Sequence, residues 1–169
     1  MPNAPSADRA NVRLFSLRAV AEVIERDARK WRFRETGGPL FGYWTADQDL
    51  VLNAAGLSGP RSRRSVLGFQ AERTFEWELI EQVVRDSEGA YTYVGDWHTH
   101  PIGSCFPSAR DRATAMSVAA SPEAGTAQPV LWIASQTAWP WRRARHGCFL
   151  FQGAELRQIP VHSLSTIPG

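Results

Sequence analysis

Apolar residues recur with helical spacing in three stretches of the chain. Between residues 16 and 31 they follow one another at intervals of three and four, which predicts an amphipathic helix. Residues 71–87 show the same pattern, with glutamates at the remaining positions. Residues 108–120 predict a third helix, because Ser108 can cap it and Asp111 places a negative charge in its first turn.

Shorter runs that are rich in aromatic and β-branched residues predict strands. One segment between them, residues 56–68, is dominated by glycine, proline, serine and arginine, so we expect a long exposed loop there. The predicted strands cover residues 40–44, 50–52, 91–100, 129–134 and 148–151.

Helices and strands are mixed along the chain, and no internal repeat is visible. This order predicts a single α/β (mixed α+β) domain, in which helices pack against one mixed β-sheet. We place the domain at residues 11–160, between a flexible N-terminus at residues 1–10 and a C-terminal tail at residues 161–169.

Composition narrows the class of protein further. The formal net charge of +2 over 169 residues is too small for a general binder of nucleic acids or anionic membranes. Two cysteines do not make a disulfide framework, and neither a secretory signal nor a run of about eighteen apolar residues is visible. We therefore expect a cytoplasmic protein without nucleic-acid or membrane partners.

The candidate chemistry lies with the histidines. His98 and His100 are two residues apart near the end of a predicted strand, so their imidazoles point to the same face. A catalytic zinc takes three protein ligands and leaves one position for water. Asp111 can supply the third ligand if its helix folds back onto the end of the strand. Taken alone, a His-x-His pair is more often two surface or hydrogen-bonded histidines than a metal site, and Ser108 and Asp111 could be only a helix cap.

The longer sequence pattern that contains these residues favours the metal site. The sequence H-T-H-P at residues 98–101, followed after a loop by S-A-R-D at residues 108–111, resembles the JAMM motif of the JAB/MPN metalloproteases. Upstream, Glu35 begins the segment E-T-G-G-P-L-F-G, which resembles the bacterial form of the family's glutamate motif. The patterns of other zinc enzymes, H-E-x-x-H and the deaminase P-C-x-x-C, are absent from the sequence. The resemblance spans about residues 10–152.

The resemblance implies a fold and a role for each matching residue. The fold would be the curved sheet of the MPN/JAB (cytidine-deaminase-like) architecture. His98, His100 and Asp111 would bind one zinc ion, with a water as the fourth ligand. Glu35 would act as the general base, and Ser108 would donate a hydrogen bond to the developing oxyanion.

The resemblance also implies a reaction, the hydrolysis of an amide or isopeptide bond. Many members of the family remove ubiquitin-like proteins from their targets, and the C-terminal tail of the substrate then lies extended beside the zinc. Short bacterial members are encoded beside ubiquitin-activating-like and conjugating-like enzymes, in some cases in antiphage (CBASS-type) operons. We therefore expect a zinc isopeptidase that acts on a ubiquitin-like protein or on a protein conjugated in that manner. The alternatives are a peptidase for sulfur-carrier or other ubiquitin-like precursors, and a non-catalytic MPN scaffold.

Several other residues remain open to more than one interpretation. Asp96 shares the face of the histidines, where it could orient an imidazole or be a simple strand-end carboxylate. We expect Cys105 to have a packing or surface role, Cys148 to be a small buried hydrophobe, and His146 and His162 to be uninvolved.

Arginine is concentrated at residues 61–64 and 142–145, and the second segment follows Trp139-Pro140-Trp141. Basic and aromatic residues in this arrangement are typical of a recognition surface, and they are also found in solvated turns. Both segments are therefore candidate surfaces for a protein partner.

Overall fold

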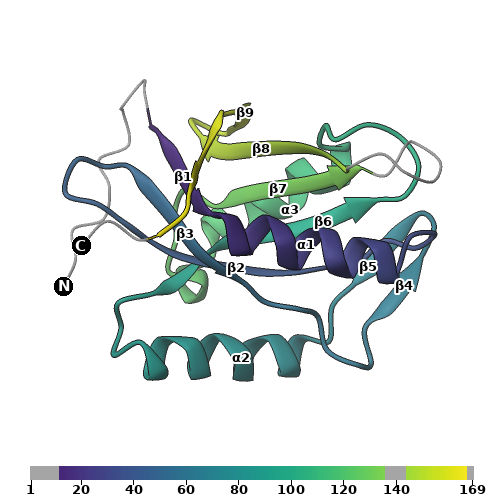
Figure 1. Cartoon of the computed structure of the whole chain (residues 1–169), viewed down its shortest axis with the longest axis horizontal. Coiled ribbons are helices and arrows are strands. Elements are labelled where there is room, and N and C mark those ends of the chain that lie inside the picture. Colours follow the sequence, from purple (N-terminus) through teal and green to yellow (C-terminus); the bar gives the residue numbers. More distant parts are fainter. Residues whose placement is uncertain (1–11, 136–143, 167–169) are drawn as a thin grey trace.

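The architecture is a large mixed β-sheet with helices on both faces (Figure 1). The computed structural model describes residues 12–135 and 144–166. Within this part of the chain, eight strands form the sheet in the order β10-β1-β3-β2-β6-β7-β8-β9. The strands are β1 (Leu14–Leu17), β2 (Gly37–Trp44), β3 (Leu50–Ala55), β6 (Thr92–His100), β7 (Val130–Ser135), β8 (Arg145–Gln152), β9 (Glu155–Gln158) and β10 (Val161–Leu164).

The three predicted helices are present, with small changes at their ends. They are α1 (Arg18–Lys30), α2 (Arg73–Asp86) and α3 (Ala109–Ala120), and a short 3-10 turn (Pro122–Ala124) follows α3. None of the helices in the described part of the chain is long and apolar enough to cross a membrane.

The faces of the sheet differ in what covers them. Val20 and Ile24 of α1 are fully buried in the larger core cluster, which also contains Trp97 and Trp132 from the sheet. Ala115 of α3 belongs to a second, smaller cluster with other residues of β7 and β8. Because β7 is covered on both faces, all of its residues are buried, as expected for a central strand.

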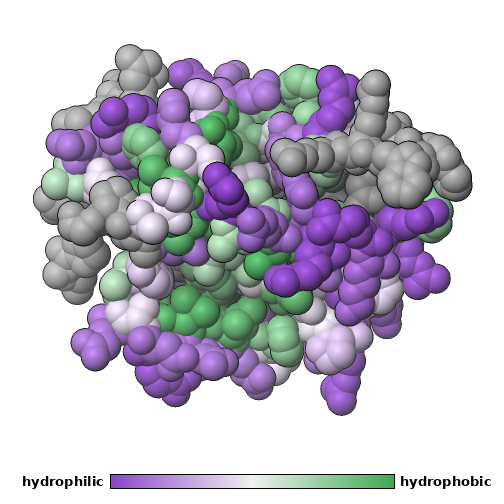
Figure 2. Space-filling model, in the orientation of Figure 1, coloured by the Kyte–Doolittle hydropathy of each residue, from purple (hydrophilic) through white to green (hydrophobic). Residues whose placement is uncertain are grey.

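Helix α2 is attached differently. It packs against β2 and β6, but none of its residues is completely buried. Figure 2 shows apolar residues gathered on the face of the molecule between the positions of α1 and α2. Helix α2 therefore forms an outer wall of the domain and is not part of its core.

The structure changes the expected boundaries in two places. The segment expected as a C-terminal tail from residue 161 contains β10, which pairs in parallel with β1 at the end of the sheet. The segment expected as an exposed loop contains a short hairpin of β4 (Arg63–Ser65) and β5 (Gly68–Gln70). Strands of three or four residues are too short to show a periodic pattern, so only their pairing reveals them.

Candidate active site

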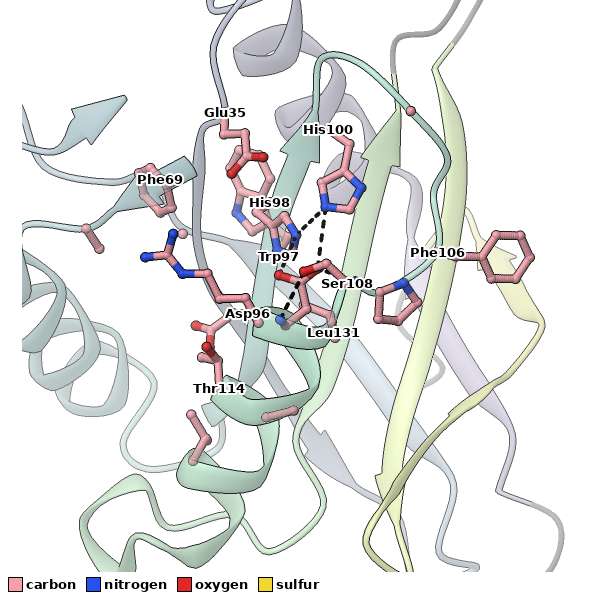
Figure 3. Close-up of a pocket in the computed structure, with 18 of the residues that line it drawn as sticks. Glu35, Phe69, Asp96, Trp97, His98, His100, Phe106, Ser108, Thr114 and Leu131 are labelled. Carbon is pink, nitrogen blue, oxygen red and sulfur yellow. Dashed lines mark hydrogen bonds and ion pairs between the residues drawn. The ribbon is translucent and has the colours of Figure 1, made fainter. Parts of the chain in front are cut away.

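One cavity brings together all five residues of the expected catalytic set (Figure 3). Its volume is about 730 Å³, and it opens beside the end of β6, the first turn of α3 and the β4–β5 hairpin. His98 and His100 come from the end of β6, Ser108 and Asp111 from the start of α3, and Glu35 from the segment just before β2.

The histidines and Asp111 form a compact group of potential ligands. His98 Nε2 lies 3.0 Å from His100 Nε2, and the carboxylate oxygens of Asp111 lie 3.3 Å from His98 Nε2 and 3.5 Å from His100 Nε2. Ligands of a tetrahedral zinc, each about 2.0–2.2 Å from the ion, are about 3.3–3.6 Å apart. The two nitrogens and one oxygen therefore fit a single ion without large movements.

The hydrogen bond of His100 Nδ1 shows that this ring nitrogen carries a proton. His100 Nδ1 lies 2.8 Å from the backbone carbonyl oxygen of Ser104. A carbonyl oxygen only accepts hydrogen bonds, so Nδ1 carries a proton, and Nε2 is the ring nitrogen that faces the ligand group and would bind a metal.

His100 and Asp111 each shift the pKa of the other. The hydrogen bond with Asp111 raises the pKa of His100 above its ordinary value, although burial acts in the opposite direction. Burial acts to raise the pKa of Asp111, but hydrogen bonds with His100 and His98 outweigh it and hold this pKa well below its ordinary range. Asp111 is therefore an anion beside the two imidazoles, as a metal ligand must be.

The start of α3 holds Asp111 in place through a capping box. Ser108 Oγ accepts a hydrogen bond from the backbone N–H of Asp111 at 3.2 Å, and the Asp111 carboxylate accepts one from the backbone N–H of Ser108 at 2.7 Å. This is the cap that the sequence predicts. It uses a lone pair of the Ser108 hydroxyl, so the hydroxyl proton can still be donated into the cavity.

Glu35 reaches the same cavity because β2 approaches β6 very closely. Gly37 lies opposite His98 in the antiparallel pairing, and a Cβ on Gly37 would meet the carbonyl oxygen of Trp97 at 2.4 Å and His98 Cβ at 3.0 Å. A Cβ on Gly38 would meet the carbonyl oxygen of Gly56 at 2.3 Å. A side chain at position 37 or 38 would therefore collide with a neighbouring backbone, which explains why both residues are glycine.

The position of Glu35 suits a group that exchanges protons. Burial raises the pKa of Glu35 above its ordinary value, and the nearby His98 and His100 act against this rise. A carboxyl group with a raised pKa is a better proton acceptor than an exposed glutamate. In Figure 3 the side chain of Glu35 lies beside those of His98 and His100.

A bulge in β6 brings a tyrosine to the carboxylate of Asp96. Asp96 lines the cavity, but its carboxylate accepts a hydrogen bond from the Tyr93 hydroxyl at 2.7 Å. The pairing of β2 with β6 shifts between Leu40 and Phe41, which leaves one extra residue in β6 and brings Tyr93 to the side of Asp96. Strict alternation along the strand places the two residues on opposite faces, so the sequence could not reveal this contact.

A second carboxyl group near Asp96 was missed by sequence reasoning. Glu76 of α2 lines the same cavity, and burial together with the charge of Asp96 raises its pKa to about 7. Burial also raises the pKa of Asp96 to about 6. Glu76 follows the glutamate pattern of a solvated helix face, and only the packing of α2 against β6 separates it from the others.

The other described residues that the sequence singled out are not among those that line the cavity. His146 accepts a hydrogen bond from Trp132 Nε1 at 2.8 Å, and its other nitrogen lies 3.3 Å from a carboxylate oxygen of Glu25, so it links the sheet to α1. His162 is exposed on β10, Cys148 is buried and Cys105 is half-buried. In the first arginine segment Arg61 and Arg63 are exposed, whereas Arg64 is half-buried. Residues 139–143 lie outside the described residues.

Comparison with known proteins agrees with this geometry. Residues 17–146 match the model of the prokaryotic homologues of the JAB domain. The chain belongs to this prokaryotic JAB family. The family resemblance of the H-T-H-P and E-T-G-G segments is thereby confirmed, and so is the predicted mixed sheet flanked by helices.

Two relatives of this JAB protein have informative names. The probable metalloprotease y4qB of Sinorhizobium fredii is 36% identical over 114 residues, which cover 67% of this chain and 70% of the relative. The CD-NTase/cGAS isopeptidase of Enterobacter hormaechei subsp. hoffmannii is 30% identical over 131 residues, which cover 71% of this chain and 67% of the relative. The JAB chain is therefore an enzyme of the peptidase type, and its family implies a metal ion.

A solved structure shows the same fold at low sequence identity. The solution structure of protein DSY2949 from Desulfitobacterium hafniense superposes with a TM-score of 0.67 at 17% identity and covers 91% of this JAB chain and 94% of that chain. This likeness supports the fold.

Proposed function

We propose that this JAB protein is a zinc-dependent isopeptidase that cleaves the bond after the C-terminus of a ubiquitin-like protein, or of a protein conjugated in that manner. One observation carries the proposal. His98, His100 and Asp111 form a ligand group in a cavity that Glu35 and Ser108 also line. A scaffold domain without catalysis has no need of all five residues in this arrangement.

The ligand atoms favour zinc as the metal. Two imidazole nitrogens and one carboxylate oxygen form the donor set of catalytic zinc sites, in which three protein ligands leave a fourth position for water. A bound zinc supplies a Lewis acid that lowers the pKa of that water and polarises the scissile carbonyl group.

The side chains supply the proton transfers. Glu35 accepts one proton from the attacking water and later donates it to the departing amine, so the two products are a carboxylic acid and a free amine. Ser108 donates its hydroxyl proton in a hydrogen bond to the oxygen that becomes negatively charged when the carbonyl is attacked.

The walls of the cavity suit an extended peptide. Val66 and Leu67 at the tip of the β4–β5 hairpin line the cavity, and so do Ile102 and Phe106 of the loop between β6 and α3. All four side chains are exposed, and Leu67 is 87% exposed. Within the described residues β5 pairs only with β4, so its other edge is available for backbone hydrogen bonds with a substrate tail.

The name of the Enterobacter relative points to a substrate class. That protein is named a CD-NTase/cGAS isopeptidase, and it shares 30% identity with most of this chain. We therefore extend the proposal to a nucleotidyltransferase-type protein that is attached through its C-terminus, which would place the enzyme in antiviral defence.

A fluorogenic substrate with a glycine-terminated tail tests the reaction directly. We expect the zinc-loaded protein to release the fluorophore, a chelator to abolish release, and added zinc to restore it. Glu35→Gln should keep its zinc and lose about 10²–10⁴-fold in kcat, because the proton acceptor is removed and the ligands are not. The measurements are initial rates and metal content per protein molecule.

The ligand variants complete this test. His98→Ala and Asp111→Ala should lose both zinc and activity, because each removes one of the ligand atoms. Full zinc occupancy in both variants would disprove the ligand assignment. A zinc-loaded wild-type protein that cleaves no tail substrate would instead disprove the isopeptidase proposal.

A further inference from the structure

Thr36, the residue after Glu35, is held by side chains or backbone groups from three separate elements. Its side chain is fully buried. Its hydroxyl donates a hydrogen bond to the Asp27 carboxylate on α1 at 2.8 Å and accepts one from Arg64 Nε on β4 at 3.3 Å. The hydroxyl of Thr36 thus links α1 to the β4–β5 hairpin.

The same residue is bonded to the strand that carries the metal ligands. The backbone N–H of Thr36 donates to the Thr99 hydroxyl at 3.0 Å, and the backbone N–H of Thr99 donates to the carbonyl oxygen of Thr36 at 2.8 Å. Thr99 stands between His98 and His100 in the chain. The backbone next to Glu35 is therefore joined directly to the backbone between the two histidine ligands.

Arg64 is itself fixed by several contacts. Its guanidinium group lies 4.4 Å from the centre of the Trp31 ring, donates to the carbonyl oxygen of Ser62 at 3.2 Å, and also bonds the hydroxyl of Ser58. On the same strand, the carbonyl oxygen of Ser65 accepts a hydrogen bond from the backbone N–H of Glu35 at 2.7 Å. Arg64 therefore belongs to the support of Glu35, and this distinguishes it from the exposed Arg61 and Arg63.

We propose that Thr36, together with Asp27 and Arg64, is a positioning group that sets the place of the Glu35 carboxylate relative to His98 and His100. The inference rests on the proposed role of Glu35 as the proton acceptor. A proton acceptor works only at a defined distance, and a displacement of about 1 Å can lower a rate by about 10²-fold.

A purely structural role gives a different expectation. Removal of one partner of a buried hydrogen bond leaves the other partner unsatisfied, which destabilises the fold. If Thr36 and Asp27 served folding alone, their replacement would change the free energy of unfolding, and the kcat of the folded fraction would not change. The two roles therefore differ in kcat.

The test compares Thr36→Val, which keeps the shape and removes the hydroxyl, with Thr36→Ser, which keeps the hydroxyl. With the glycine-tail substrate we expect Thr36→Val to lose about 10–100-fold in kcat with unchanged KM and full zinc content. Thr36→Ser should retain kcat within about three-fold. Thr92→Val, at the exposed start of β6, is the matched control and should behave as wild type.

A second variant covers the case in which Thr36→Val does not fold. Arg64→Lys keeps the charge but cannot bond Thr36 while it stacks on Trp31, so we expect a loss of kcat in the same direction. Arg157→Lys on the distant and exposed β9 is its control.

The outcomes separate this inference from the proposed function. An active wild type, an inactive Glu35→Gln, and wild-type kcat in both Thr36→Val and Arg64→Lys would overturn the positioning role and leave the proposed function intact. A loss of kcat that is accompanied by an equal loss of zinc, or that Thr36→Ser does not rescue, would also overturn it. An inactive wild type would overturn both.

Discussion

At the scale of single residues, two side chains at the start of α3 each perform two tasks. Asp111 accepts the hydrogen bond of the capping box and also faces both histidines. Ser108 accepts the reciprocal bond and lines the cavity with its hydroxyl. The helix start and the ligand group are thus built from the same atoms, so the fold of this turn and the chemistry of the site depend on each other.

Substitution of Ser108 can separate its two tasks. Relative to serine, alanine at an N-cap costs about 0.5–2 kcal/mol of stability, whereas glycine costs only a few tenths. We expect Ser108→Ala to be less stable than Ser108→Gly in urea unfolding, and both to lose about 10²–10³-fold in kcat. Unchanged kcat in both variants would show that Ser108 is only a cap.

At the scale of elements, the close contact between β2 and β6 organises the site. The strands approach so closely at Gly37 that no side chain fits between its backbone and Trp97. Because Gly37 lies opposite His98, this contact places the segment of Glu35 beside the histidines. The hairpin and α1 then fix the same segment from the other sides.

Gly37→Ala should therefore disturb both stability and metal binding. The added Cβ meets backbone atoms of β6, which cannot move without breaking the pairing, so we expect a loss of about 1–3 kcal/mol and lower zinc occupancy. Gly68→Ala is a suitable control, because its Cβ would meet the flexible end of Arg110 at 3.1 Å and Ser65 Oγ at an ordinary contact distance of 3.8 Å. Thermal unfolding and metal analysis distinguish them, and a Gly37→Ala protein as stable and as zinc-loaded as wild type would contradict the steric argument.

At the scale of the whole molecule, one edge of the sheet is built from distant parts of the chain. Strand β1 lies between β10 and β3, so segments near both ends of the domain meet at one edge of the sheet. Just before β1 and β3, Arg13 Nε donates to a carboxylate oxygen of Asp49 at 3.1 Å, and the guanidinium group also bonds the other oxygen. This ion pair ties the two strand starts together.

The ion pair predicts a pH dependence of stability. The hydrogen bond from Arg13 holds the pKa of Asp49 below its ordinary value, so the pair stabilises the fold fully above the unfolded pKa of about 3.9 and is lost as pH falls through the folded value. We expect Asp49→Asn to lower the free energy of unfolding at neutral pH, and the difference from wild type to shrink below about pH 4. Urea unfolding between about pH 3 and 7 measures this, with Asp47→Asn in the exposed turn as the control.

Local sequence was sufficient to predict the three helices, the longer strands and the cluster of His98, His100 and Asp111. Helical spacing and alternation are visible within single segments, and His98, His100, Ser108 and Asp111 lie within one short stretch whose spacing already limits their geometry.

Other features were decided only by the tertiary structure, because they depend on pairing between distant segments. Strand β10 and the β4–β5 hairpin are too short for a periodic signal and exist through their partners. The bulge in β6 brings Tyr93 to Asp96 against simple alternation, and Glu76 is half-buried because α2 packs against β6. The bonds of Thr36 to Asp27 and Arg64 join α1 to the hairpin, so no local pattern could have predicted them.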